Sequence, residues 1–311
     1  MADAQAGAGE QQDYLLPKKR TTTGKTFTHT AWRVASLTFF PFLVFSIVLI
    51  LWVFAYHEAP FIVYMSIVAL GILALVFLVS GFMHQMQGGG RRPAAGRVHF
   101  YMALFIFLAC VVGYIVGEHI YTEYMEVYHG YVENQVYNNV VATDAAQYFS
   151  DAGKIHFNEA ARVDTDKSVG FKQGGTMYCV APVVQTGSTE TNKVEFWAVG
   201  LNCCDKKGVF DCDDSHNAKA KGAVVVMGDE FLEKAVKKAE VAFSLVSSSE
   251  PVYVRWVNSP DDVVNAQYNQ AVGHMLIAMA GYLIMSLLLA IVGNIIIMNQ
   301  SKSQGGGAEE P

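Results

Sequence analysis

The sequence predicts a membrane protein that joins an all-α four-helix bundle to a large α+β domain, stapled by disulfides, on the outward or luminal side. Three observations predict this fold class. The 311-residue chain is 52% hydrophobic, and its apolar residues concentrate in four long runs. Its basic residues gather at one set of run ends. Four of its five cysteines lie between the third and fourth runs, where a separate folded domain is therefore expected.

The four apolar runs are each expected to cross a membrane as a helix. A crossing takes about 20 apolar residues, and no run contains Asp, Glu, Lys or Arg in its interior. Residues 32–117 are expected to hold the first three transmembrane helices, and residues 271–299 the fourth. The first three cover about 34–56, 61–82 and 100–116. The polar ends, 1–31 and 300–311, are expected to be disordered cytosolic tails.

Basic residues predict the side of the membrane that each loop faces. Lysines and arginines precede the first run, and Arg91, Arg92 and Arg97 fill the loop between the second and third runs. The loop between the first two runs, YHEAP, has none. Because basic loops stay on the cytoplasmic side, both termini are expected in the cytosol. The protein is then a multi-pass protein of the plasma membrane or an endomembrane.

This orientation divides the charges unequally. The cytosolic segments carry nine basic residues against five acidic ones, and the outward segments carry 13 against 23. An acidic exterior argues against nucleic acid as a partner. The expected partners are other membrane proteins, further copies of the chain as a homo-oligomer, and the lipid bilayer.

The outward cysteines predict two disulfides. Cys179, Cys203, Cys204 and Cys212 lie in the outward segment, whereas Cys110 lies within the third span. An even number of cysteines in an oxidising compartment indicates a disulfide framework. Adjacent Cys203 and Cys204 would form a strained ring with each other, so each is expected to pair with Cys179 or Cys212. The sequence leaves both such pairings open.

Alternating apolar residues predict a small α+β or α/β domain around these cysteines. Strands are expected at 176–184, 193–201, 222–227 and 251–257. The polar turn QTGSTETN joins the first two strands as a hairpin. Between the last two strands, Asp229 is a helix cap, and the residues after it form one apolar face.

Helical stalks are expected to join this domain to the membrane, so that residues 118–270 form the stalk plus the domain. The stretch from Gly117 to Val141 lacks proline and extends the third span. Ser259-Pro260-Asp261-Asp262 is a strong helix start, and nothing breaks the helix before Gln300. Its length of roughly 60 Å is twice the hydrocarbon thickness. Four tyrosines fall on one face of the first stalk, as expected for packing: Tyr121, Tyr124, Tyr128 and Tyr131.

No catalytic, cofactor or metal motif is recognisable. The chain has no G-x-S-x-G, H-E-x-x-H, phosphate loop or dinucleotide fingerprint, so no catalytic or cofactor-binding residue is assigned and no enzyme is expected. The acidic loop suggests an alternative metal site, but zinc-type spacing and the calcium-loop glycine are missing. A solvated loop is favoured. The residues of the alternative site are Asp205, Asp211, Asp213, Asp214 and His216, together with the thiols of the neighbouring cysteines.

Small and polar residues in the spans are candidates for helix packing. Gly71 and Gly281 permit close helix contact, within the bundle or between copies, and Asn294 can hydrogen-bond a neighbouring helix. His274 lies near the outer end of the fourth span. The spans contain no charge path of the kind that transporters usually show.

The plan of the chain resembles that of the tetraspanins. Cys203-Cys204 resembles the paired cysteines of the tetraspanin CCG motif, although Asp205 stands where that family has glycine. The four spans, the cytosolic termini and the large loop between the third and fourth spans are also similar. The strand-rich domain departs from the mostly helical loop of that family. The resemblance therefore implies an architecture and carries over no binding residues.

These observations favour a non-enzymatic membrane protein that acts as an organiser or accessory subunit through its outward domain. The alternatives are a component of a channel or transporter, and a membrane-anchored luminal module that binds a ligand.

Overall fold

The computed structural model describes residues 23–87, 93–187 and 192–305. It divides into two compact units, which we describe separately. The helical unit comprises residues up to Val48, Tyr64–Gly113 and the chain from Ala278; the sheet unit comprises Leu49–Val63 and Tyr114–Ile277. Four predicted features lie wholly or partly outside the described residues. They are the two terminal tails, the arginine-bearing loop at 88–92 and the turn at 188–191.

All four predicted spans are helices long and apolar enough to cross a membrane. Their mean hydropathies lie between 2.3 and 2.8. The chain is therefore built as a membrane protein. The helices that hold the spans are α1 (Thr23–Ile50), α2 (Pro60–Gln87), α3 (Pro93–Ile120) and α6 (Pro260–Gly305).

The first and last helices extend further than the sequence predicts. Helix α1 begins at Thr23, inside the stretch 1–31 that we expected to be a tail, and it continues through Pro41. Helix α6 runs to Gly305, past the expected end at residue 299. A helix that is already nucleated gains a hydrogen bond with each added residue. Polar flanks without helix breakers therefore join the apolar helices.

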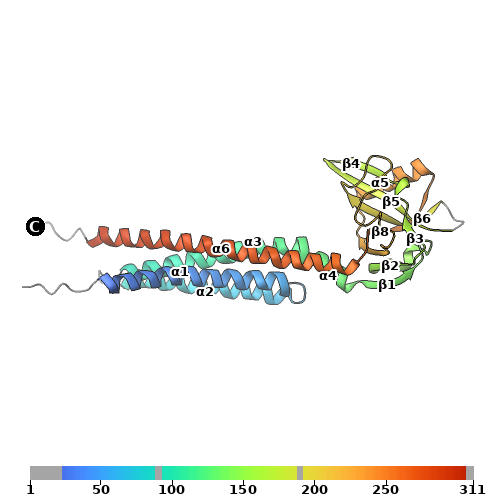
Figure 1. The fold of residues 1–311 in the computed structure, drawn as a ribbon. Coiled ribbons are helices and arrows are strands. Elements are labelled where there is room, and N and C mark those ends of the chain that lie inside the picture. Colours follow the sequence, from blue (N-terminus) through green and yellow to red (C-terminus); the bar gives the residue numbers. More distant parts are fainter. Residues whose placement is uncertain (1–22, 88–92, 188–191, 306–311) are drawn as a thin grey trace, which may run out of the picture. The chain divides into compact units, whose positions relative to one another are not determined.

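Within the helical unit, the helices contact one another in pairs (Figure 1). A Cβ atom at Gly81 of α2 would lie 3.0 Å from the carbonyl oxygen of Gly96 in α3. Helices α1 and α6 meet where Phe45 stacks on Tyr282, with ring centroids 4.0 Å apart. Nearby, the Ser286 hydroxyl donates to a carbonyl oxygen of α1 at 2.9 Å.

The expected helical extension of α3 is shorter than predicted. It continues through a π-helical turn, η2 (Tyr121–Met125), and through α4 (Glu126–Glu133), and it ends there rather than at Val141. Strand β1 (Gln135–Val140) begins two residues later. The segment QVYNNV forms this strand by pairing in parallel with β2, and its Val136, Tyr137 and Val140 favour strands. A second π-helical turn, η1 (Leu51–Ala55), follows α1.

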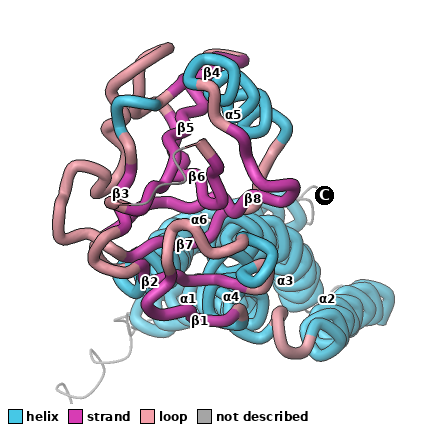
Figure 2. Tube along the Cα trace, turned by 90° about the vertical axis from the view of Figure 1, so that its right-hand side faces the viewer, coloured by secondary structure: helices cyan, strands magenta, loops and turns pink. Residues whose placement is uncertain are grey.

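The sheet unit contains an eight-stranded mixed sheet (Figure 2). The strand order is β1-β2-β7-β8-β6-β5-β3, and β4 also pairs with β5. Strands β1 and β2 are parallel, as are β6 and β8, and the other pairs are antiparallel. The bounds after β1 are β2 Ala152–Phe157, β3 Ala161–Val163, β4 Val169–Gln173, β5 Thr176–Gln185, β6 Lys193–Leu201, β7 Gly222–Val226 and β8 Val246–Val257.

The two faces of this sheet form two apolar cores, because successive strand residues point to opposite faces. On one face, helix α5 (Glu230–Phe243) buries Leu232 and Val236 against Trp197. Asp229 caps this helix as predicted, accepting hydrogen bonds from two backbone N–H groups. The other face buries Phe196 with Phe157 and Trp256. The predicted strands and helix around the cysteines are thus present in one α+β domain.

The ends of the stalk helices are fixed to the sheet within the sheet unit. Lys154 of β2 donates to Asp261 in the first turn of α6 at 2.7 Å. Gly222 of β7 lies so close to Pro260 that a Cβ atom there would be 2.5 Å from the ring. The predicted start of α6 is present, with Ser259 accepting from the Asp262 backbone N–H at 3.4 Å. At the other end, a Cβ atom at Gly153 of β2 would lie 2.8 Å from the Tyr131 carbonyl oxygen of α4, so the sheet contacts both stalk helices.

Candidate functional site

The four cysteines between the third and fourth spans form the two predicted disulfides. Cys204 pairs with Cys179 on β5, and Cys203 pairs with Cys212. The structure thus selects one of the two pairings that the sequence leaves open. Cys110 is free and buried, as expected for a cysteine within the third helix.

Two glycines make room for these disulfides. A Cβ atom at Gly200 of β6 would lie 2.5 Å from the Cys203 sulfur and 2.6 Å from that of Cys212. A Cβ atom at Gly170 of β4 would lie 3.1 Å from the Cys204 sulfur. Each disulfide therefore packs directly on the backbone of a strand, at a position that tolerates no larger residue.

A cleft of about 530 Å³ opens beside the Cys203–Cys212 disulfide. Arg255 of β8 binds Asp213 through two hydrogen bonds, of 3.0 and 2.6 Å, at this cleft. Two large apolar side chains of the lining stay in contact with solvent: Met227 is 93% exposed and Leu201 is 58% exposed. The remaining lining includes Tyr178, Val199, Val226, Asp229 and Leu232. The cleft thus places exposed apolar side chains next to an oriented ion pair.

Glu195 of β6 is a buried acid within the sheet unit. Its side chain is only 3% exposed, and Lys193 approaches one carboxylate oxygen at 2.5 Å. The Ala146 backbone N–H donates to the other oxygen at 3.0 Å. Burial alone would raise the pKa of this carboxyl, but the hydrogen bonds from Ala146, Lys193 and Ser248 outweigh it and lower the pKa. Glu195 is therefore a charged structural group.

The acidic loop does not bring its candidate ligands together. Asp213 is engaged by Arg255, and Asp214 accepts from the Asn258 backbone N–H at 2.8 Å. His216 lies 3.7 Å from Asp211 at the surface. Within the described part of the chain, these residues do not form a group of three ligands that could hold one metal ion.

The predicted packing residues of the spans have unequal surroundings. A Cβ atom at Gly71 or Gly281 would meet no atom within 4 Å, so neither glycine makes a close contact within the described chain. Contact between copies stays a prediction for both. Asn294 is buried, and its amide reaches Met298 at 3.8 Å. The close helix contacts are made instead by Gly81, Gly96 and Gly113, whose faces of α2 and α3 meet other helices.

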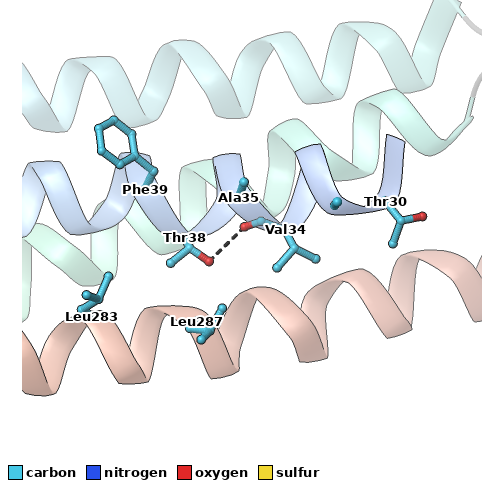
Figure 3. Close-up of a pocket in the computed structure, with 8 residues that line it drawn as sticks. Thr30, Val34, Ala35, Thr38, Phe39, Leu283 and Leu287 are labelled. Carbon is cyan, nitrogen blue, oxygen red and sulfur yellow. Dashed lines mark hydrogen bonds between the residues drawn. The ribbon is translucent and has the colours of Figure 1, made fainter. Parts of the chain in front are cut away.

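An apolar crevice of about 520 Å³ lies between α1 and α6 in the helical unit. Figure 3 shows its lining, in which Val34 of α1 lies toward Leu287 of α6, whereas the Phe39 ring projects from the other side of α1. The Thr38 hydroxyl donates back to the Val34 carbonyl oxygen at 2.9 Å and is thereby satisfied within its own helix. The crevice offers apolar contact and no free polar anchor among the residues drawn.

A second side-chain cluster lies in the sheet unit, where the turn after η1 meets η2 and α4. His57, from the turn after η1, stacks on His129 of α4 with ring centroids 3.9 Å apart and planes 3° apart. His57 Nε2 is hydrogen-bonded to Glu133, and His57 Nδ1 lies 3.0 Å from the Tyr121 hydroxyl. One nitrogen of each histidine and one Glu133 oxygen lie within 4.8 Å of one another. We call His57, His129 and Glu133 the histidine cluster.

An aromatic frame surrounds the histidine cluster. Trp52 stacks on Tyr56 at 4.2 Å and meets Tyr114 edge-on at 5.2 Å. Tyr56 in turn meets Tyr121 edge-on at 4.8 Å. Gly117 permits this arrangement, because a Cβ atom there would lie 2.6 Å from Trp52. The π-helical turns η1 and η2 carry Trp52 and Tyr121, and such turns are frequent at functional sites.

The predicted tyrosine stripe packs along the stalk. Tyr124 stacks on His274 of α6 at 4.8 Å, and Tyr128 lies 5.5 Å from Tyr268. The His274 Nδ1 donates to the Gln270 carbonyl oxygen at 2.8 Å, which accounts for this polar side chain within its helix. Tyr121 contributes to the histidine cluster, a role that the spacing of the tyrosines does not indicate.

Comparison with known proteins finds no match for this chain to any protein-family model, any curated protein or any solved structure. Functional conclusions therefore rest on the residues and geometry described above.

Proposed function

We propose that the protein is a four-span membrane protein, a tetraspanin-like four-helix bundle with both termini in the cytosol and the sheet domain on the outward or luminal side. The basic residues at the ends of the spans support this orientation. The two disulfides support it independently, because they persist in oxidising compartments.

The sheet domain acts as an organiser or accessory subunit by binding another membrane protein, without catalysis. The observation that carries this proposal is the cleft beside the Cys203–Cys212 disulfide. Met227 and Leu201 expose apolar surface there, and Arg255 and Asp213 hold each other in a fixed orientation. Exposed apolar anchors on a rigid frame are the features that give protein interfaces most of their binding energy.

The charge of the domain indicates the chemistry of its partner. The outward segments carry ten more acidic than basic residues, and Asp229 adds a carboxylate to the cleft lining. Electrostatic complementarity favours a partner segment in which Lys or Arg flanks an apolar side chain. The apolar side chain would contact Met227 and Leu201, and the basic ones the acidic rim.

Site-specific photo-crosslinking in the native membrane tests this proposal. A photoreactive amino acid replaces Met227 at the cleft or, as the matched control, Val241 of α5, which is 86% exposed and does not line the cleft. We expect the Met227 position to crosslink to one outward segment with the predicted basic and apolar residues. Leu201→Glu should reduce that crosslink at least tenfold, because it buries a charge in the contact.

Three results would overturn the proposal. Equal, diffuse crosslinking at both positions would show that the cleft is not a docking surface. Crosslinks to a second copy of the chain would replace the accessory role with self-assembly. A bound small molecule in place of a protein would favour the ligand-binding module.

A channel or transporter component is the second candidate, favoured by one observation. The Asn294 carbonyl oxygen is buried among the described residues without a hydrogen-bond partner, although it lies within an apolar span. Unpaired polar groups inside a membrane mark functional positions. Ion flux through the purified protein in liposomes distinguishes the candidates: selective flux that Asn294→Leu abolishes would favour transport, and its absence favours the organiser.

A further inference from the structure

We propose that the Cys203–Cys212 disulfide is a site of thiol–disulfide exchange, which takes the thiolate of a small thiol at the cleft and passes the exchange on to Cys179–Cys204. The exchange would replace the bond between β5 and Cys204 with a bond between β5 and Cys212. This activity goes beyond the proposed docking function and does not depend on it.

Three sulfur atoms from the two disulfides lie close together. Those of Cys179, Cys203 and Cys212 are all within 4.8 Å of one another, although Cys179 is bonded to Cys204. The Cys204 sulfur does not belong to this group. Exchange requires a thiolate to reach a sulfur atom of a second disulfide. Opening of Cys203–Cys212 would therefore release its thiolates beside the Cys179 sulfur, which is their next target.

The cleft gives a thiol unequal access to the two disulfides. Cys203 and Cys212 line the cleft, and among the described residues that line it there is neither Cys179 nor Cys204. Cys203 is only partly buried, whereas Cys179 is completely buried and Cys212 is 2% exposed. A thiolate that enters the cleft therefore meets the Cys203–Cys212 disulfide first, and Cys203 is the more accessible of its two residues.

The loop that Cys203–Cys212 closes has a strained backbone. Val209 has a φ of 30°, which is a genuine outlier for a β-branched residue. Such a conformation persists only where the surrounding structure enforces it, and the disulfide contributes by tying the ends of the loop together. Strained or exposed disulfides are the labile ones. We therefore expect Cys203–Cys212 to open before Cys179–Cys204.

Contacts of the loop keep its cysteines in place after the disulfide opens. Phe210 is 1% exposed and belongs to one of the two apolar cores of the sheet. The Asp211 backbone N–H donates to the Cys203 carbonyl oxygen at 2.8 Å, and Cys204 forms a bridge with Phe210. None of these contacts uses a sulfur atom. The released Cys212 thiolate is therefore held near Cys179, and such proximity raises the rate of an intramolecular step.

The exchange consists of two displacement steps. The external thiolate attacks the Cys203 sulfur, forms a mixed disulfide there and releases Cys212 as a thiolate. The Cys212 thiolate attacks the Cys179 sulfur, forms Cys179–Cys212 and releases Cys204 as a thiolate, which takes up a proton from water. Two disulfides are present before and after these steps, so there is no net oxidation or reduction. Cys204 does not displace the external thiol from Cys203, because the two neighbours would close a strained ring.

Trapping with reduced glutathione tests this sequence of steps. The full-length protein in detergent carries Cys110→Ser, which removes the free thiol. It is treated briefly with reduced glutathione and then alkylated with N-ethylmaleimide at mildly acidic pH, which stops further exchange. Fragment-ion mass spectrometry assigns each cysteine of the species that carries one glutathione. We expect glutathione on Cys203, a bridge between Cys179 and Cys212, and the alkyl group on Cys204.

The identity of the alkylated cysteine decides the proposal. Alkylation of Cys212, with Cys179–Cys204 intact, would show a disulfide that opens without passing the exchange on. Alkylation of Cys179 would show that the second disulfide opens in another way. The absence of any glutathione adduct would show that the cleft does not admit a thiolate. Each of these three results overturns the proposal.

A variant without the first disulfide is the matched control. Cys203→Ala combined with Cys212→Ala keeps Cys179–Cys204 and removes the site of the first attack. It should take up glutathione about tenfold more slowly than the parent. Uptake at the rate of the parent, by a variant with the circular dichroism spectrum of the parent, would show direct attack on Cys179–Cys204 and overturn the proposal. If the spectrum differs, the mapping of the parent decides alone. Both measurements use the purified protein without a partner, so their failure leaves the crosslinking test of the docking cleft unaffected.

Discussion

Adjacent cysteines at 203 and 204 can reach two different partners because neighbouring side chains of an extended chain point to opposite sides. Cys204 reaches β5 and Cys203 reaches Cys212, so one short segment closes two loops. Gly170 and Gly200 supply the space in which the sulfur atoms lie. At the scale of the residue, the two disulfides therefore depend on glycine positions in two strands as much as on the cysteines.

Glu195 gives a residue-scale prediction for the pH dependence of stability. The pKa of Glu195 in the folded protein is lowered from its ordinary value, which is about 4.3 in an unfolded chain. The charged form therefore stabilises the fold above about pH 4.3, and this contribution is lost as the pH falls through the folded-state pKa. Glu195→Gln should remove this contribution. Between pH 6 and pH 3, the free energy of unfolding of the variant should therefore fall less than that of the parent protein.

Chemical denaturation of the full-length protein at each pH measures this difference. Glu159→Gln changes an exposed acid and is the matched control. If acidification lowers the free energy of unfolding of Glu195→Gln as much as that of the control, the hydrogen bonds from Ala146 and Lys193 do not stabilise the charged form of Glu195.

At the scale of the element, the sequence predicts the segments whose periodicity is regular. Strands β5, β6, β7 and β8 and helix α5 each show one clear apolar pattern, and the structure confirms them. Strands β1 to β4 were not predicted. They are short or irregular: β1 is mostly exposed and shifts register at two places, and β3 has only three residues. These strands are stabilised by pairing with their neighbours in the sheet, and their own sequences show no clear apolar periodicity.

The histidine cluster could be predicted only in part. His129 and Glu133 lie four residues apart, so a helix places both on one face, and that spacing is visible in the sequence. His57 lies 76 residues before Glu133, in the loop YHEAP between the first two spans. In the sequence this loop indicates only the orientation of the spans, through its lack of basic residues. No local spacing links such distant segments. The two π-helical turns that orient them have no sequence signature that we can recognise.

Two glycines of the stalk give an element-scale prediction with opposite signs. Gly117→Ala places a Cβ atom 2.6 Å from Trp52, and relieving such a clash costs about 1–3 kcal/mol. Gly130→Ala meets no atom within 4 Å and should stabilise α4 by up to about 1 kcal/mol through helix propensity. Thermal unfolding in detergent, followed by tryptophan fluorescence, measures both. Equal shifts of the two variants would show that Gly117 is not in close contact with Trp52.

At the scale of the whole molecule, the basic residues and the disulfides support the same proposed orientation for different physical reasons. Basic residues resist transfer across the bilayer during insertion, whereas disulfides form only after a segment reaches an oxidising compartment. In this chain the arginine-bearing loop follows the second apolar helix, and the disulfides follow the third. The loop and the disulfides therefore lie on opposite sides of a membrane that each helix crosses once. Neither signal depends on the fold of the sheet domain, so the orientation can be tested without it.

Labelling of single cysteines in intact cells tests that orientation. In a Cys110→Ser background the native outward cysteines are paired, so only an introduced thiol reacts. Met227→Cys lies on the exposed surface of the sheet domain, and Ala8→Cys lies in the N-terminal segment. For a chain routed to the plasma membrane, a maleimide that cannot cross membranes should label the Met227→Cys variant at once. It should label the Ala8→Cys variant only after permeabilisation, which serves as the control for the reactivity of both.

For a chain retained in an endomembrane, sealed vesicles that expose their cytosolic face should give the reverse order. Labelling of both sites from the same face would mean that an even number of the helices crosses between them, and the four-span arrangement would be wrong.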